Sequence, residues 1–151
     1  MNKEEKRKRI LEISNLKGPT IELVDEVNQL KLEIIQDLLE KEGMINNVKA
    51  GKKDRRKHKI GKCYYNAARM TEENYYYVEG IITHKKNGYQ ICHAWNEDMN
   101  GEWWDFTLDD PEDFDYKGIK IPNMPIYETG ARNGRIWPIL LLFIDSIEEL
   151  Y

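Results

Sequence analysis

The feature that most constrains the fold is a change of hydrophobic period near the middle of the chain. Between residues 20 and 43 the apolar side chains recur at helical spacing, which is typical of an amphipathic helix. After residue 74 apolar and polar residues alternate instead, as they do in strands that bury one face. The sequence therefore predicts an α+β fold in which N-terminal helices pack with an antiparallel sheet.

Local signals mark where the helices begin and end. Thr20 follows Pro19 and suits the N-cap of the long helix, and Gly43 suits its C-terminal end. A shorter helix is expected over residues 3–16. A third helix is expected in "CYYNAARMTEE", where Cys63 is the first residue.

Three strands are expected in the second half, in the segments "NYYYVEGIITHKK", "GYQICHAWNED" and "EWWDFTL". Turn signals at Asn87-Gly88 and Asn100-Gly101 separate them, so they predict an antiparallel meander. A two-residue loop at the first turn places Gly80 opposite Trp95, where a glycine leaves room for the indole.

The remainder of the chain is expected to be less regular. Residues 109–134 are rich in proline and glycine and predict a long loop, whose relation to any site is open. In the last segment, "RIWPILLLFIDSIEELY", the apolar centre suits a buried strand as well as a helix, and Trp137 is most simply a core residue. We expect one domain over 1–151, with a helical extension at 1–48, a core at 60–108 and a loop plus apolar element at 109–151.

Composition limits the compartment and the partners. The chain has 151 residues, a net charge of -4 and two cysteines, too few for a disulfide framework. It shows no secretory signal and no apolar run of membrane-spanning length, so a cytoplasmic protein with free thiols is expected, without a membrane partner. The acidic net charge also argues against a nucleic-acid partner.

Charge is unevenly distributed along the chain. Residues 49–62 are strongly basic, and residues 97–115 are strongly acidic. One interpretation is a solvated loop and an acidic rim that partly offset each other. The other is that the basic run, which ends beside Cys63, attracts an anionic substrate or partner.

Cys63 is the first candidate for chemistry. A thiolate is the useful nucleophile, and the unpaired N–H groups of a helix start, together with Lys57, Lys59 and Lys62, favour that form. The Cys63 N–H is also placed to donate to a developing oxyanion. The alternative is a buried structural cysteine.

His93 is the candidate base. Strand alternation places it on one face with Ile91 and Trp95, an apolar face of the kind that packs on a helix, whereas Cys92 points to the other face. Cys92 is therefore a poor partner for His93, and zinc binding by these residues is not expected. The alternative for His93 is a hydrogen-bonded core residue.

Asp105 is the candidate orienting acid, and loop length decides its face. A two-residue loop at Asn100-Gly101 would turn it away from His93. A three-residue loop from Met99, with Gly101 in the left-handed conformation, makes Asp105 a diagonal neighbour of His93. The alternative is an exposed carboxylate at a strand end.

The pattern "C…HAW…G-x-W-x-D-x-T" over residues 60–108 resembles the transglutaminase-like branch of the papain-like thiol enzymes, and also a group of small bacterial and phage proteins. The resemblance implies a cysteine-bearing helix packed on a sheet that carries histidine and aspartate. It makes Cys63 the nucleophile, His93 the base and Asp105 the orienting acid. The papain-type upstream glutamine is missing, so Asn66, a backbone amide or the basic loop would supply the second oxyanion donor.

The expected function is a thiol hydrolase or acyltransferase that acts on an amide or isopeptide bond of a protein or peptide-like substrate, without cofactor or metal. Trp95 and Trp103 are expected to position the substrate or to line the site. The alternative is a non-catalytic binding module that keeps the fold, for example a phage-encoded inhibitor of a host protein. Such a module would bind its partner protein through its acidic rim or its basic loop.

Overall fold

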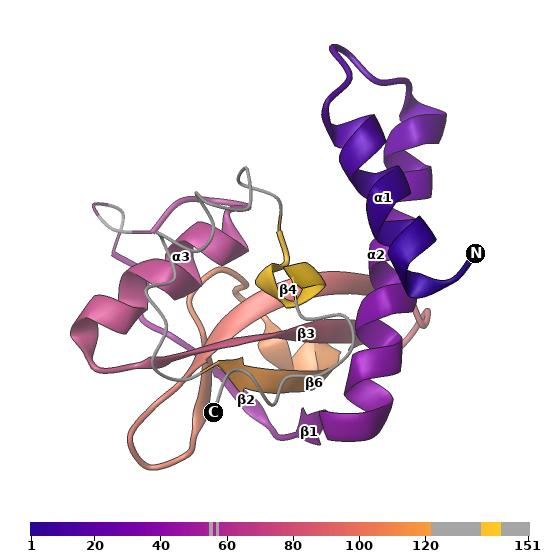
Figure 1. Ribbon diagram of the computed structural model, residues 1–151. Coiled ribbons are helices and arrows are strands. Elements are labelled where there is room, and N and C mark those ends of the chain that lie inside the picture. The colour runs from indigo at the N-terminus through magenta and orange to yellow at the C-terminus, as the bar shows by residue number, and fades with distance from the viewer. Residues whose placement is uncertain (55, 57, 122–136, 143–151) are drawn as a thin grey trace.

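The computed structural model describes residues 1–54, 56, 58–121 and 137–142. Over these ranges the chain forms three α-helices and a curled six-stranded sheet, a mixed α+β fold (Figure 1). None of the helices in the described part is long and apolar enough to cross a membrane.

The predicted helices are present. They are α1 (Lys3–Ser14), α2 (Ile21–Glu42) and α3 (Cys63–Met70). As expected, Thr20 caps α2, because its Oγ1 accepts a hydrogen bond from the Leu23 N–H at 3.3 Å. Gly43 is the C-cap, and its N–H donates to the Leu39 carbonyl at 2.9 Å. Figure 1 shows α1 lying alongside α2, which continues onto the sheet.

The sheet has the strand order β1-β6-β3-β4-β5-β2. Its strands are β1 (Met44–Ile45), β2 (Val48–Ala50), β3 (Tyr76–His84), β4 (Gln90–Glu97), β5 (Trp103–Asp105) and β6 (Phe114–Ile121). The predicted antiparallel meander is β3-β4-β5. Short 3-10 helices occur at Thr71–Glu73, Pro111–Asp113 and Ile139–Leu142.

Strand β6 corrects the long loop predicted at residues 109–134. It pairs along its whole length with β3 and so lies inside the sheet. The sequence does not predict this strand, because Gly118 is typical of a loop. A Cβ at Gly118 would lie 2.5 Å from the Trp95 ring, so a glycine is required for the indole to fit. Residues 122–134 of the predicted loop lie outside the described residues.

The first hairpin also differs from its prediction. The loop has four residues, Lys85 to Gly88, and is closed by a bond from the His84 N–H to the Tyr89 carbonyl at 2.8 Å. Gly80 therefore faces His93 rather than Trp95. The expected structural role of Gly80 beneath the indole belongs instead to Gly118. The shift is by two residues, so each side chain keeps its predicted face.

Two apolar clusters occupy the opposite faces of the sheet. Helices α2 and α3 and residues 139–141 cover one face, where Ala67 and Ala68 pack with Ala94. Trp137 is half-buried against this cluster, as expected. The second cluster lies on the face that carries Trp95, and its members are Val78, Ile82, Trp95, Trp103 and Tyr116. His93 shares the second face, so the expectation that its face packs on a helix is wrong.

Candidate active site

Cys63 is the first residue of α3, and its half-buried thiol is free. The helix starts without a side-chain cap at Lys62, and its first turn closes through the Asn66 N–H and the Lys62 carbonyl at 2.9 Å. The first N–H groups of an α-helix have no acceptor within the helix. The Cys63 N–H is one of these groups, so it is available to a negatively charged oxygen beside the thiol.

His93 lies within β4 and is 3% exposed. Its ring stacks beside Trp95, with 6.1 Å between centroids and 24° between planes. The edge of Tyr116 approaches from β6, with centroids 6.2 Å apart. Two aromatic rings on neighbouring positions thus fix the plane of the imidazole.

Asp105 faces His93 because of the register between β4 and β5. Asn96 pairs with Trp104, and the Asp98 N–H donates to the Glu102 carbonyl at 2.8 Å. This is the register of a three-residue loop, and Gly101 has the required positive φ of 79°. The predicted odd-length loop is therefore confirmed.

The Asp105 carboxylate is completely buried and is held by four donors. Oδ2 lies 2.7 Å from His93 Nε2 and accepts the Tyr116 hydroxyl at 2.7 Å. Oδ1 accepts the N–H groups of Thr107 and Leu108 at 2.8 and 2.9 Å. Burial raises the pKa of Asp105. The hydrogen bond and charge of His93, together with the other donors, lower this pKa by more than burial raises it, so the net pKa is below its usual value.

Cys63 and Asp105 act on His93 together. Burial lowers the pKa of His93, whereas hydrogen bonds and negative charge from Asp105 and Cys63 raise it more strongly, to about 10. Asp105 occupies Nε2, which leaves Nδ1 as the ring nitrogen for the thiol. The imidazole and the carboxylate thus form one hydrogen-bonded pair, and the Cys63 thiol is near enough to His93 to help raise its pKa.

Tyr116 belongs to this group and was not found from the sequence. Its hydroxyl is the only side-chain donor to Asp105 besides His93 among the described residues. The alternation in "FDYKGIKI" is the available signal, but the proline- and glycine-rich segment around it predicts a loop. Its contribution depends on the pairing of β6 with β3, which no local pattern specifies.

Asn66 does not have the free amide expected of an oxyanion donor. Its Oδ1 accepts the Lys59 N–H at 2.7 Å, and its Nδ2 donates to the Lys59 carbonyl and to Thr107 Oγ1 at 2.8 and 2.9 Å. Both amide hydrogens are therefore engaged within the protein. Asn66 instead ties the segment before Cys63 to the turn after Asp105.

The two tryptophans expected to contact substrate are internal. Trp95 is 0% exposed and Trp103 is 3% exposed, and they pack edge to face with centroids 5.3 Å apart. Trp103 Nε1 donates to Glu97 Oε1 at 3.0 Å. Trp95 supports the imidazole of His93, and the burial of both tryptophans leaves them out of reach of a substrate.

The basic run contacts the acidic run directly. Lys49 pairs with Glu102 at 3.2 Å, and Lys53 pairs with Asp109. Lys59 Nζ lies over the Tyr65 ring, 4.7 Å from its centroid. Lys57 lies outside the described residues. These contacts favour the interpretation in which the two charged runs partly offset each other.

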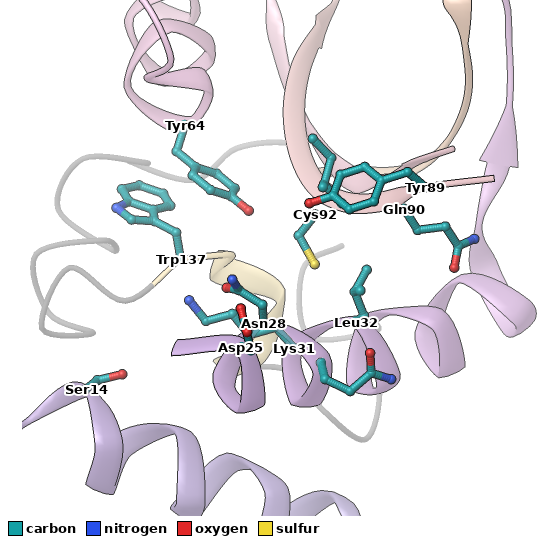
Figure 2. Close-up of a pocket in the computed structure, with 12 residues that line it drawn as sticks. Ser14, Asp25, Asn28, Lys31, Leu32, Tyr64, Tyr89, Gln90, Cys92 and Trp137 are labelled. Carbon is teal, nitrogen blue, oxygen red and sulfur yellow. The ribbon is translucent and has the colours of Figure 1, made fainter. Parts of the chain in front are cut away.

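A pocket of about 700 Å³ lies between α2 and the sheet, on the face of the sheet opposite His93 (Figure 2). Cys63 and His93 do not line it, but their chain neighbours Tyr64 and Cys92 do. The Cys92 sulfur is turned toward α2, away from the His93 face, as strand alternation predicted. Burial raises the pKa of Cys92 to about 12, so its thiol is neutral at ordinary pH.

No group of three histidine, cysteine, aspartate or glutamate side chains in the described ranges is arranged to hold a metal ion. Comparison of the chain with protein-family models, with curated proteins and with solved structures gives no match.

Proposed function

We propose that the protein is a cytoplasmic thiol hydrolase or acyltransferase with a papain/transglutaminase-like core, acting on an amide or isopeptide bond of a peptide-like substrate. Cys63 is the nucleophile, His93 the general base and Asp105 the orienting acid in this proposal. The observation that carries it is that His93 Nε2 is hydrogen-bonded to a buried carboxylate of lowered pKa, while the half-buried Cys63 thiol at a helix start raises the pKa of the same imidazole. Nucleophile, base and orienting group in this relation are the requirement for thiol acyl transfer.

In the proposed reaction the Cys63 thiol gives its proton to His93 Nδ1, and the sulfur adds to the carbonyl carbon. The carbonyl oxygen becomes negatively charged and is stabilised by the Cys63 N–H at the start of α3. His93 then protonates the amine, the C–N bond breaks, and a thioester remains on Cys63. Water or a second amine, deprotonated by His93, attacks the thioester and regenerates the thiol. Asp105 holds Nε2 throughout.

The thiolate requirement predicts selective alkylation. At pH 6 iodoacetamide should label Cys63 in preference to Cys92, because burial raises the pKa of the Cys92 thiol to about 12 and keeps that thiol protonated. Peptide mapping by mass spectrometry of the wild type, Cys63→Ala and Cys92→Ala measures this. We expect loss of labelling in Cys63→Ala and no change in Cys92→Ala.

An activated ester tests the acyl-enzyme itself. With p-nitrophenyl acetate we expect one acetyl group on Cys63, detected by intact mass, and its transfer to water or to an added amine. His93→Gln should slow both steps. Slow labelling of both thiols only at high pH, without an acetyl adduct, would contradict the proposal.

The near-complete burial of His93 favours a second candidate, a binding module that retains the fold without catalysis. In that case His93 and Asp105 are a structural pair, and the functional surface is the charged rim. An unreactive Cys63 in a folded protein is the result that favours this candidate.

A further inference from the structure

We infer that the pocket beside Cys63 is a carboxylate-binding subsite, in which Lys31 and Tyr64 hold an anionic group of the substrate. The inference rests on the proposed function for its link to catalysis. The binding site itself is argued from the groups that line the pocket.

Lys31 is a half-buried cation on α2 that lines the pocket. It makes no ion pair or hydrogen bond with any residue that the structure describes. Its neighbour Cys92 carries a neutral thiol and supplies no counter-charge. The buried carboxyl of Glu79, which lies on the same face of the sheet, is already engaged by Tyr77 and by the N–H groups of residues 139 and 140. The ammonium group is therefore left with an unmet preference for an anion.

Asp25 also lines the pocket, and it is the acidic group that competes for Lys31. It lies on the exposed side of α2, six positions before Lys31, and the two residues form no ion pair. Residues six apart on a helix do not face each other as residues three or four apart do. Asp25 therefore marks the rim of the pocket and does not neutralise Lys31.

Tyr64 supplies a second donor from the opposite wall. Its ring stacks on Trp137, with centroids 5.4 Å apart and 14° between planes. Figure 2 shows its hydroxyl directed into the space between α3 and α2, and this hydroxyl makes no hydrogen bond with a described residue. Burial raises the pKa of Tyr64 well above its usual value, so the hydroxyl stays protonated and can donate. An ammonium and a hydroxyl on facing walls are complementary to a carboxylate.

The position of the pocket connects it to the proposed chemistry. Tyr64 follows Cys63 in α3, so the pocket begins one residue from the proposed nucleophile, whereas Cys92 lines the pocket from the face of β4 opposite His93. Its volume of about 700 Å³ is in the range that holds a small molecule or one or two amino-acid residues. The substrate class this predicts is an acylated amino acid or peptide end with a free carboxylate a few bonds from the amide that is cleaved.

Binding of N-benzoylglycine, a carboxylate, and of its neutral amide N-benzoylglycinamide tests the subsite by calorimetry. The protein used is Cys63→Ala, so that no reaction intervenes. We expect the carboxylate to bind at least about tenfold more tightly than the amide, a difference of about 1.4 kcal/mol. Adding Lys31→Met or Tyr64→Phe should reduce this preference, and Lys31→Arg should keep it. Lys41→Met, which removes an exposed lysine of the same helix, should change nothing.

A second measurement uses the thiol. Iodoacetate carries a carboxylate where iodoacetamide carries a neutral amide of similar size, and Lys31→Met should slow alkylation of Cys63 by iodoacetate at least about tenfold relative to iodoacetamide. Equal binding of the two benzoyl compounds, or no binding of either, overturns the subsite. A carboxylate preference that requires Lys31, found together with an unreactive Cys63, keeps the subsite and overturns the proposed function. A reactive Cys63 without a carboxylate preference keeps the proposed function and overturns the subsite.

Discussion

Replacing Tyr116 by phenylalanine removes one hydroxyl from the donors that hold Asp105. The ring is 2% exposed and packs edge to face with Trp95, with centroids 5.0 Å apart, and phenylalanine keeps this burial and this contact. The lost bond is a 2.7 Å donor to a buried carboxylate. Hydrogen bonds to charged groups contribute about 1.5–3 kcal/mol, and no water replaces a donor to a completely buried oxygen without a cavity to hold it. We therefore expect the free energy of unfolding to fall by about 2 kcal/mol.

For a chain of this length such a loss corresponds to a decrease of roughly 4–8 °C in Tm. Urea unfolding followed by tryptophan fluorescence measures the free energy, and a calorimetric scan measures Tm. Tyr89→Phe is the matched control, because Tyr89 is 64% exposed, and its change should stay within about 0.5 kcal/mol. If Tyr116→Phe unfolds with the same free energy as the wild type, Asp105 does not depend on this hydroxyl, and the four-donor description of the carboxylate is wrong.

Two further changes test the packing and the charges around the sheet. Gly118→Ala places a Cβ 2.5 Å from the Trp95 ring, so we expect a loss of about 1–3 kcal/mol in urea unfolding, and a loss below about 0.5 kcal/mol would contradict the close approach. Burial raises the pKa of Glu79 to about 7 from its usual 4.5, so the folded state holds this proton more tightly. Stability should therefore fall as pH rises from 4.5 to 7, by roughly 3 kcal/mol, and the fall should be absent in Glu79→Gln. Parallel pH profiles for the two proteins would refute this assignment.

The parts of the fold that the sequence predicts are those set by short-range patterns. Helical spacing and the Thr20 cap define α2, and alternation defines β3 and β4. The register of Asp105 could also be predicted, because loop length and a glycine at residue 101 determine which face each following side chain takes. These signals all lie within a few residues of the element that they specify.

The parts that were missed depend on contacts between distant segments. The glycine at 118 is typical of a loop until the Trp95 ring is seen against it, so the sequence predicts a loop where β6 and Tyr116 lie. The hydrogen bonds of Asn66 to Lys59 and Thr107 likewise join three separate segments. The subsite at Lys31 has the same character, because nothing in the α2 sequence indicates that this lysine faces a tyrosine on α3.

The arrangement makes the proposed catalytic carboxylate part of the hydrophobic core. Asp105 receives donors from β4, from β6 and from its own turn, so the strands that define the sheet also fix the orientation of His93. Disrupting the carboxylate should thus cost stability as well as reactivity. Cys63 differs, because its half-buried thiol lies at the start of a short helix and is not one of the groups hydrogen-bonded to Asp105. This division of roles predicts different results for two variants. Cys63→Ala should be as stable as the wild type but unreactive, whereas Asp105→Asn should be both less stable and less reactive.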